Sequence, residues 1–323
     1  MNGMFSPRKR QNALAAQVSS SSRFRLSGCY RTKFSTRYSP QFAARISLAL
    51  AVGLSTSCWH MASAGMHPFS SSQVAAMASA GVHQGQYPDC WFEASLAALA
   101  NSHKGQKLIA DMITENPDSS FTVVFPGDKS RSFKVEHETS GKICNRARWA
   151  NIIEAASRQE FPDNDAGDRP SRGRPKIKTG LSVLTGKTAN LLSISSSNST
   201  QLEHLIEDCI SRGNPAVLST KSIAEISSLP AVILPSHAYA LIGYDSKSKT
   251  LTLRNPLGDS VERQFANQAE LDIANGVEPN EDACPLPLAG QERAGVKNLG
   301  DGLIRVKLAT LKQYGRFISW SAL

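Results

Sequence analysis

The sequence predicts an α+β fold, with helices in the first half of the folded part and strands in the second. Two observations predict it. Between residues 89 and 160, apolar residues recur at helical spacing in several segments. After residue 216, short segments alternate apolar and polar residues or run apolar, which is typical of strands. This segregation favours α+β over a doubly wound sheet, in which helices and strands alternate along the chain.

The positive charge of the chain lies at its N-terminus. The 323 residues include 36 Lys and Arg against 27 Asp and Glu, a net charge of +9. Nine of the cations fall within residues 1–88, and the first carboxylate of the chain is Asp89, so the remainder is formally neutral. A nucleic-acid-binding domain needs basic residues spread over its folded surface to neutralise phosphates. We therefore expect no nucleic-acid partner for the folded part.

Residues 1–65 have the composition of a targeting or secretion leader. They are rich in Arg and Ser, contain no acid, and end in Ala62-Ser63-Ala64, a small-residue pattern typical of a cleavage site. An organelle transit segment, an extended secretory signal and the leader of an injected bacterial effector all fit. A disordered basic tail without an address fits as well. We expect a disordered leader that directs secretion or targeting, and a cytoplasmic protein if the leader carries no address.

A Ser- and Ala-rich linker is predicted at residues 66–82, followed by one folded domain at residues 83–323. The longest apolar run, residues 46–54, is shorter than the ~20 residues that span a bilayer, so we expect no stable membrane span. The six cysteines are widely spaced without a CxxC pair. This pattern favours thiols over a zinc site or a disulfide framework.

The first helix of the folded part is predicted to begin at Asp89. Aspartate is a favoured N-cap, and the apolar residues of the next dozen positions share one stripe. Cys90 then lies in the first turn, where the helix dipole and the backbone N–H groups favour an anion. We expect a cysteine that ionises readily.

Further elements follow in order. A second helix is predicted at residues 106–114. A hairpin is predicted from strands at 121–125 and 132–138 around a Pro-Gly-Asp turn. A core-facing helix is expected at 148–159, and residues 162–180, rich in charges, Pro and Gly, are expected to form a solvated loop.

The last third of the chain is predicted to be mainly β. A helix is expected at 202–210 and a short strand at 216–220. Strands at 237–245 and 250–256 flank an Asp-Ser-Lys-Ser turn. Residues 260–300 carry no readable pattern.

Three short motifs in this part of the chain resemble those of a known family. They are QGQYPDCWF at residues 84–92, HAYA at 237–240 and RNPLG at 254–258. In order and spacing they are similar to the nucleophile, histidine and asparagine segments of calpains, a branch of the papain-fold cysteine proteases. Supporting similarity extends over most of residues 83–323. The resemblance implies a papain-like fold, with a helical subdomain carrying the cysteine and a β-rich subdomain carrying the histidine and asparagine.

The resemblance also implies roles for four residues. Cys90 would be the nucleophile and His237 the base. Asn255 would orient the imidazole, and the side chain of Gln84 would stabilise the oxyanion. These residue types suit the chemistry, because an amide oxygen can fix the imidazole tautomer without taking its proton. The implied function is a calpain-like cysteine endopeptidase of protein or peptide substrates, secreted or injected if the leader directs it.

Two alternatives stay open: a catalytically silent papain-fold binding module, and an acyltransferase that uses the same triad. The chemistry requires no cofactor. Calcium stays open too, but Leu257 stands where the family has a Trp, and the sequence contains no EF-hand-like acidic loop. Both observations weigh against a calcium requirement. The sequence assigns no metal ligand and no oligomeric state.

Overall fold

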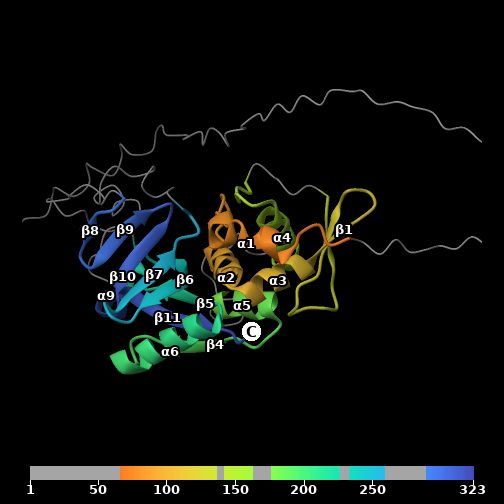
Figure 1. The fold of residues 1–323 in the computed structure, drawn as a ribbon. Helices are drawn as coiled ribbons and strands as arrows, with labels where there is room; N and C mark the ends of the chain where they lie inside the picture. Colours follow the sequence, from red (N-terminus) through yellow and green to blue (C-terminus); the bar gives the residue numbers. More distant parts are fainter. Residues whose placement is uncertain (1–65, 137–141, 163–175, 226–232, 259–288) are drawn as a thin grey trace, which may run out of the picture. The chain divides into compact units, whose positions relative to one another are not determined.

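The computed structural model of the chain describes residues 66–136, 142–162, 176–225, 233–258 and 289–323 (Figure 1). The predicted leader and much of the stretch without a readable pattern lie outside these residues. The described part is a mixed α+β fold in which the helices come mainly first and the strands mainly last. The predicted fold class is confirmed at this level.

The first part of the fold is built from helices that surround α2 (Cys90–Ala100). The others are α3 (His103–Met112), α4 (Arg148–Glu160) and α5 (Lys176–Thr185). Helix α2 contacts both α3 and α5 and is buried along nearly its whole length. The predicted helices that correspond to α2, α3 and α4 are thereby confirmed, with ends shifted by a few residues.

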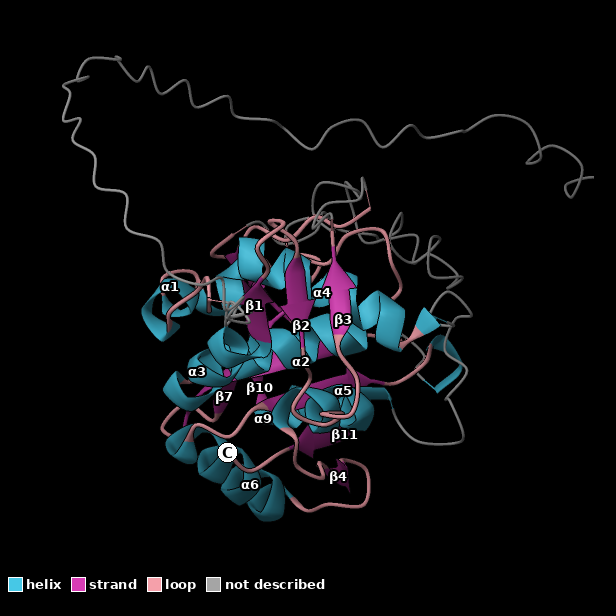
Figure 2. Ribbon diagram, turned by 90° about the vertical axis from the view of Figure 1, so that its right-hand side faces the viewer, coloured by secondary structure: helices cyan, strands magenta, loops and turns pink. Residues whose placement is uncertain are grey.

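A small antiparallel sheet packs beside α4 (Figure 2). Its strands are β1 (Ile113–Glu115), β2 (Phe121–Val123) and β3 (Phe133–Val135), in the order β1-β2-β3. Strands β2 and β3 form the predicted hairpin. The prediction that the preceding helix continues to Thr114 was wrong, because the backbone becomes extended at Ile113, a β-branched residue that favours strands.

The second part of the fold is an antiparallel sheet. Within the described residues it has eight strands in the order β4-β11-β5-β6-β7-β10-β9-β8. Strand β11, near the end of the chain, lies between β4 and β5 and so ties the C-terminus to the sheet. The bounds are β4 Asn190–Ser193, β5 Ala216–Thr220, β6 Ala238–Asp245, β7 Thr250–Arg254, β8 Glu292–Arg293, β9 Val296–Gly300, β10 Leu303–Lys307 and β11 Gly315–Trp320.

Helices cover both faces of the central strands. Val217 and Ala240 belong to the apolar cluster around α2 and α5, whereas Leu218 belongs to the cluster that includes α6 (Ser199–Arg212) and α9 (Leu308–Tyr314). Successive residues of a strand point to opposite faces, so neighbouring residues enter different clusters. A strand covered on both faces can be apolar throughout, which explains the apolar runs of β5 and β6.

The segment predicted as a linker is folded. Residues 66–82 contain α1 (Ser71–Ala75) and the 3-10 turn η1 (Ala78–Gly81), and α1 contacts α3. Although the segment is rich in Ser and Ala, it contains two fully buried side chains, Val74 and Val82, which pack into the core. The folded part therefore begins before residue 83, within the segment that was predicted to be a linker.

The solvated loop predicted at residues 162–180 ends earlier than expected. Residues 163–175 lie outside the described residues, but α5 already begins at Lys176. Buried Ile177 and Leu181 are four positions apart and share the face that packs on α2. Residues 162–180 were predicted to be a loop because the charges and prolines before this helix were given more weight than the spacing of Ile177 and Leu181.

The structure describes three of the six cysteines. Cys90, Cys144 and Cys209 are thiols. Cys29, Cys58 and Cys284 lie outside the described residues. No helix among those that the structure describes is both long and apolar enough to cross a membrane.

We predict that the turn at Gly302 accepts no side chain. Its φ is +71°, and a Cβ there would lie 2.6 Å from the Cα of Gly258 and 2.8 Å from the carbonyl oxygen of Asn255. Replacing Gly302 by Ala should lower the free energy of unfolding by about 3 kcal/mol, measured by urea denaturation. Gly290→Ala is the matched control, because Gly290 has a φ of +91° but nothing within 4 Å. Equal losses in the two variants would contradict the steric argument.

Candidate active site

The hairpin of β6 and β7 places His237 and Asn255 side by side. Its strands are antiparallel with Ala240 opposite Arg254, so the start of β6 adjoins the end of β7. His237 immediately precedes β6, and Asn255 immediately follows β7. The His237 Nε2 atom lies 2.9 Å from Asn255 Oδ1, and both side chains are buried. Two residues far apart in sequence therefore meet through the pairing of two neighbouring strands.

A second hydrogen bond of Asn255 determines where the neutral His237 ring carries its proton. Asn255 Oδ1 also accepts from the backbone N–H of Leu257, at 3.0 Å. Because a backbone N–H can only donate, the oxygen of the amide and not its nitrogen faces both partners. Nε2 of the neutral ring must then carry the hydrogen. Nδ1 keeps its lone pair, which is the form that a general base requires.

The burial of His237 keeps its ring neutral. Burial lowers the pKa of His237 to about 4, and the hydrogen bond to Asn255 opposes this effect only in part. At neutral pH the imidazole is thus uncharged and able to accept a proton. A protonated His237 ring would need a nearby negative charge, such as a thiolate at Cys90, to offset this cost.

Cys90 is the first residue of α2 and shares a cavity with His237. The cavity has a volume of about 520 Å³ and lies between α2, α5 and strands β5, β6 and β11. Helix α2 packs directly on β5 and β6, and His237 immediately precedes β6. The N-terminus of a helix stabilises a negative charge. A thiol that shares a cavity with a neutral imidazole in this way is suited to nucleophilic attack on an acyl group.

Tyr239 supports His237 from the side. The two rings meet edge to face, with centroids 5.0 Å apart and an interplanar angle of 84°. The Tyr239 hydroxyl accepts a hydrogen bond from the backbone N–H of Leu234 at 2.8 Å. Burial raises the pKa of Tyr239, and negative charge at Cys90 adds to this rise. A thiolate at Cys90 is therefore within electrostatic range of the histidine segment.

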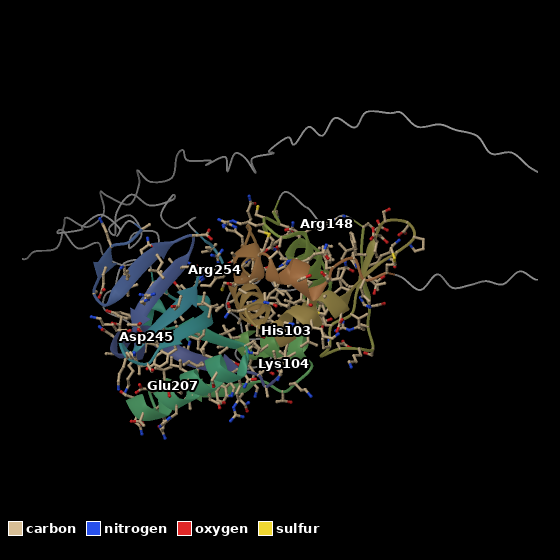
Figure 3. The ribbon with its side chains drawn as sticks, viewed as in Figure 1. His103, Lys104, Arg148, Glu207, Asp245 and Arg254 are labelled. Atoms are coloured by element: carbon tan, nitrogen blue, oxygen red, sulfur yellow. The ribbon has the colours of Figure 1, made fainter. Side chains whose placement is uncertain are left out.

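An ion pair fixes the backbone next to Asn255. Arg254 is 1% exposed and donates to the carbonyl oxygen of Asp301 and, at 3.1 Å, to its Oδ2. Arg146 binds Asp301 Oδ1 at 2.5 Å. Burial would raise the pKa of Asp301, but the two guanidinium groups outweigh it and hold the pKa below its usual value. The adjoining Gly302 carbonyl accepts the Asn255 N–H at 2.8 Å, so the pair holds Asn255 in place. Arg254, the last residue of β7, lies on the side of the sheet that faces the helical part (Figure 3).

Gln84 contacts the segment that follows Asn255, but it is not among the residues that line the cavity. The Gln84 backbone N–H donates to the carbonyl oxygen of Pro256 at 2.7 Å, next to Asn255. Its side-chain Nε2 donates to the carbonyl oxygen of Tyr87 at 2.6 Å. One amide hydrogen is thus engaged within the loop, and one remains for another acceptor. The predicted oxyanion role of Gln84 stays a prediction.

The loop before Cys90 requires a glycine. A Cβ at Gly85 would lie 1.8 Å from the carbonyl oxygen of Lys142, a distance that no side chain can occupy. The Gln86 N–H donates to the same carbonyl at 2.9 Å, and the His83 N–H donates to Asn145 Oδ1 at 2.6 Å. The loop is held from both sides, and this gives the segment leading to Cys90 a defined path.

A cluster of three carboxyl groups includes that of Asp89, the residue before Cys90. Asp89, Glu93 and Glu154 are all 0% exposed, and one oxygen of each lies within 4.8 Å of the others. Asn145 Nδ2 donates to Glu154 Oε2 at 2.7 Å. Asp89 is the N-cap residue of α2, but its side chain makes no capping hydrogen bond, in contrast to the sequence prediction.

The cluster retains protons at neutral pH. Burial raises the pKa of Glu93, and the charges of Glu154 and Asp89 raise it further. Burial, followed by the charge of Asp89, raises the pKa of Glu154 to about 9, although Arg158 acts in the opposite direction. Carboxylate oxygens are ligands for hard cations such as calcium. The three groups would have to lose these protons before they could hold a cation.

The predicted site residues are placed as follows. Cys90 and His237 line one cavity, Asn255 holds His237 from behind, and Gln84 is hydrogen-bonded to the segment after Asn255. Sequence reasoning missed the buried carboxyl cluster. The signal was present, because Glu93 is the one charged residue in the otherwise apolar stretch of α2.

We predict that Glu154→Gln flattens the loss of stability at alkaline pH. The folded pKa of Glu154 is raised from 4.5 to about 9, so its stabilising contribution is complete below 4.5 and is lost as pH rises towards 9. His237 is neutral in both states above pH 7.5, where such a group contributes a slope of about 1.4 kcal/mol per pH unit that falls to roughly half as pH reaches 9. The glutamine keeps an acceptor for Asn145 and removes that slope.

Urea denaturation at several pH values measures this effect. The exposed Glu136→Gln variant is the control and should keep the wild-type slope. If Glu154→Gln and wild type lost stability in parallel between pH 7.5 and 9, Glu154 would be ionised in the folded protein.

No protein-family model and no curated protein sequence matches this chain. The site geometry therefore carries the argument for function.

Proposed function

We propose that this chain is a cysteine endopeptidase of the calpain-like, papain-fold kind that its motifs resemble. The observation that carries the proposal is the 2.9 Å hydrogen bond from His237 to Asn255 beside a cavity that Cys90 also lines. A cysteine at a helix N-terminus, a histidine with a fixed tautomer and an orienting amide are the parts that thiol acyl transfer needs.

The division of the fold supports the same proposal. A helical part carries Cys90 at the start of α2, and an antiparallel sheet carries His237 and Asn255 at adjoining strand ends. The cavity lies where α2 packs on β5 and β6. This is the arrangement that the family resemblance implies.

In the proposed acylation step, Cys90 Sγ attacks the carbonyl carbon of a peptide bond. The thiol proton passes to Nδ1 of His237. The Nε2–H of the resulting imidazolium stays bound to Asn255 Oδ1, so the ring does not rotate away. When the tetrahedral intermediate collapses, the C–N bond breaks and the proton on Nδ1 goes to the leaving amine. The acyl group remains on Cys90 as a thioester.

Hydrolysis of the thioester completes the cycle. Nδ1 of the neutral His237 takes a proton from water, and the hydroxide formed attacks the thioester carbonyl. The second intermediate breaks its C–S bond and the proton returns to Cys90. In both steps the backbone N–H of Cys90 and the remaining amide hydrogen of Gln84 are the proposed oxyanion donors, and losing one such donor costs roughly 100-fold or more. The cycle consumes no cofactor.

We predict that Cys90 is the fastest-reacting thiol of the described part. Iodoacetamide at pH 7, followed by peptide mass spectrometry, should modify Cys90 at least about tenfold faster than the half-buried Cys144. Cys209 is a slow internal reference, because burial raises its pKa to about 12. His237→Ala should bring the Cys90 rate down to that of Cys144. A wild-type protein in which Cys90 reacts no faster than Cys144 would argue against a catalytic thiol.

A peptide library tests the reaction itself. Wild type and Cys144→Ala should cleave library peptides and Cys90→Ala should not, with and without added calcium. Intact peptides together with slow alkylation of Cys90 would indicate a binding module that has lost its chemistry. Products linked to an added amine, instead of free carboxylates, would indicate an acyltransferase.

A further inference from the structure

The cavity floor next to Cys90 is a row of residues on three neighbouring strands. Ser219 of β5 is paired with Phe317 of β11 on one side and with Ala238 of β6 on the other, and all three line the cavity. Residues that are directly opposite across antiparallel strands point to the same face. The row therefore extends from His237, next to Ala238, towards β11.

A β-bulge turns a cation into this cavity. In β11, Gly315 is opposite Thr220 and Phe317 is opposite Ser219, so Arg316 is an extra residue between them. Regular alternation would send Arg316 and Phe317 to opposite faces, but both line the cavity. A bulge re-aims a side chain in this way and is frequent near active sites.

A second cation reaches the cavity from the helical side. Lys176 is the first residue of α5 and lines the cavity together with its neighbour Ile177. Helix α5 packs against both β5 and β11, the strands that contribute Ser219 and Phe317 to the cavity. The N-terminus of α5 adds partial positive charge at the same place. No Asp or Glu is among the described residues that line the cavity.

The wall also offers a hydroxyl group. Ser219 Oγ is buried and has no hydrogen-bond partner within the described part of the protein. A buried hydroxyl without a partner costs free energy that a suitable acceptor would recover. Its position in the strand row puts this hydroxyl in the same cavity as Arg316 and Lys176.

The present partner of Arg316 holds it weakly. Arg316 Nη1 lies 3.8 Å from Glu225 Oε2, beyond hydrogen-bonding distance, and the Arg316 side chain is 51% exposed. Glu225 itself is bound by the N–H and hydroxyl of Ser222, at 2.9 and 2.7 Å. An exposed pair of this kind contributes little, so Arg316 is available to a second carboxylate.

We propose that this end of the cavity is a specificity subsite for an acidic side chain of the substrate, with Arg316 and Lys176 binding its carboxylate and Ser219 donating to it. The inference rests on the proposed endopeptidase function, because the subsite adjoins the scissile bond only if Cys90 is the nucleophile. The preferred substrates are then peptides that carry Asp or Glu beside the cleaved bond.

Hydrolysis of matched peptides tests the subsite. Sets that carry Glu, Gln, Leu or Lys at each position flanking the scissile bond should show kcat/KM at least about tenfold higher for Glu than for Gln at one position. Arg316→Gln together with Lys176→Gln should reduce this ratio to about one, and the charge reversal Arg316→Glu should favour Lys. Arg305→Gln, which removes an exposed cation on β10, is the matched control and should keep the wild-type ratio. The rate of Cys90 alkylation reports whether each variant still folds its active site.

A binding measurement separates failure of the subsite from failure of the proposed function. Fluorescence anisotropy with Cys90→Ala protein and labelled Glu or Gln peptide pools requires no cleavage. Tighter binding of the Glu pool that disappears in the Arg316→Gln, Lys176→Gln background supports the subsite even if no peptide is hydrolysed. Cleavage or binding without a preference for Glu over Gln, or a preference that survives both substitutions, would overturn it.

Discussion

The hydrogen bond between His237 and Asn255 is the contact on which the site depends. Burying an imidazole and an amide costs free energy unless their polar atoms are paired. The β6–β7 hairpin provides that pairing, and Arg254 and Asp301 fix the turn that holds Asn255. The Leu257 N–H fixes the orientation of the Asn255 amide. The hydrogen bond between Asn255 and His237 then places the ring hydrogen of His237 on Nε2 and leaves Nδ1 as the base. Stability and chemical competence at this point come from one set of hydrogen bonds.

The environment of Cys90 combines a helix N-terminus with three buried carboxyl groups. The helix N-terminus favours a thiolate, whereas ionised carboxyl groups would disfavour it. The pKa of Glu154 is raised to about 9 and that of Glu93 is raised too, so the cluster carries less negative charge near the thiol than its composition suggests. The helix dipole can then favour a thiolate without strong repulsion from the carboxyl cluster. On the other side, Arg316 and Lys176 make the open cavity cationic.

The sequence was informative where periodicity and local chemistry agree. The strands that carry His237 and Asn255 and the helix that begins at Cys90 could be predicted because their apolar patterns are regular. Helix α5 was missed, since the Pro-rich basic stretch before it masked the spacing of Ile177 and Leu181. The bulge at Arg316 depends on strand register, and the carboxyl cluster depends on contact between α2 and α4. Neither has a local signature, so neither could be read from composition or spacing.

The protonation of His237 tests the central claim most directly. Long-range ¹H–¹⁵N NMR of the Cys90→Ala protein, in which no thiolate is present, reports both the tautomer and the titration of the ring. We predict hydrogen on Nε2 and a bare Nδ1 at pH 7, with titration near pH 4. Hydrogen on Nδ1, or titration near the ordinary value of 6.5, would contradict a buried base held by Asn255.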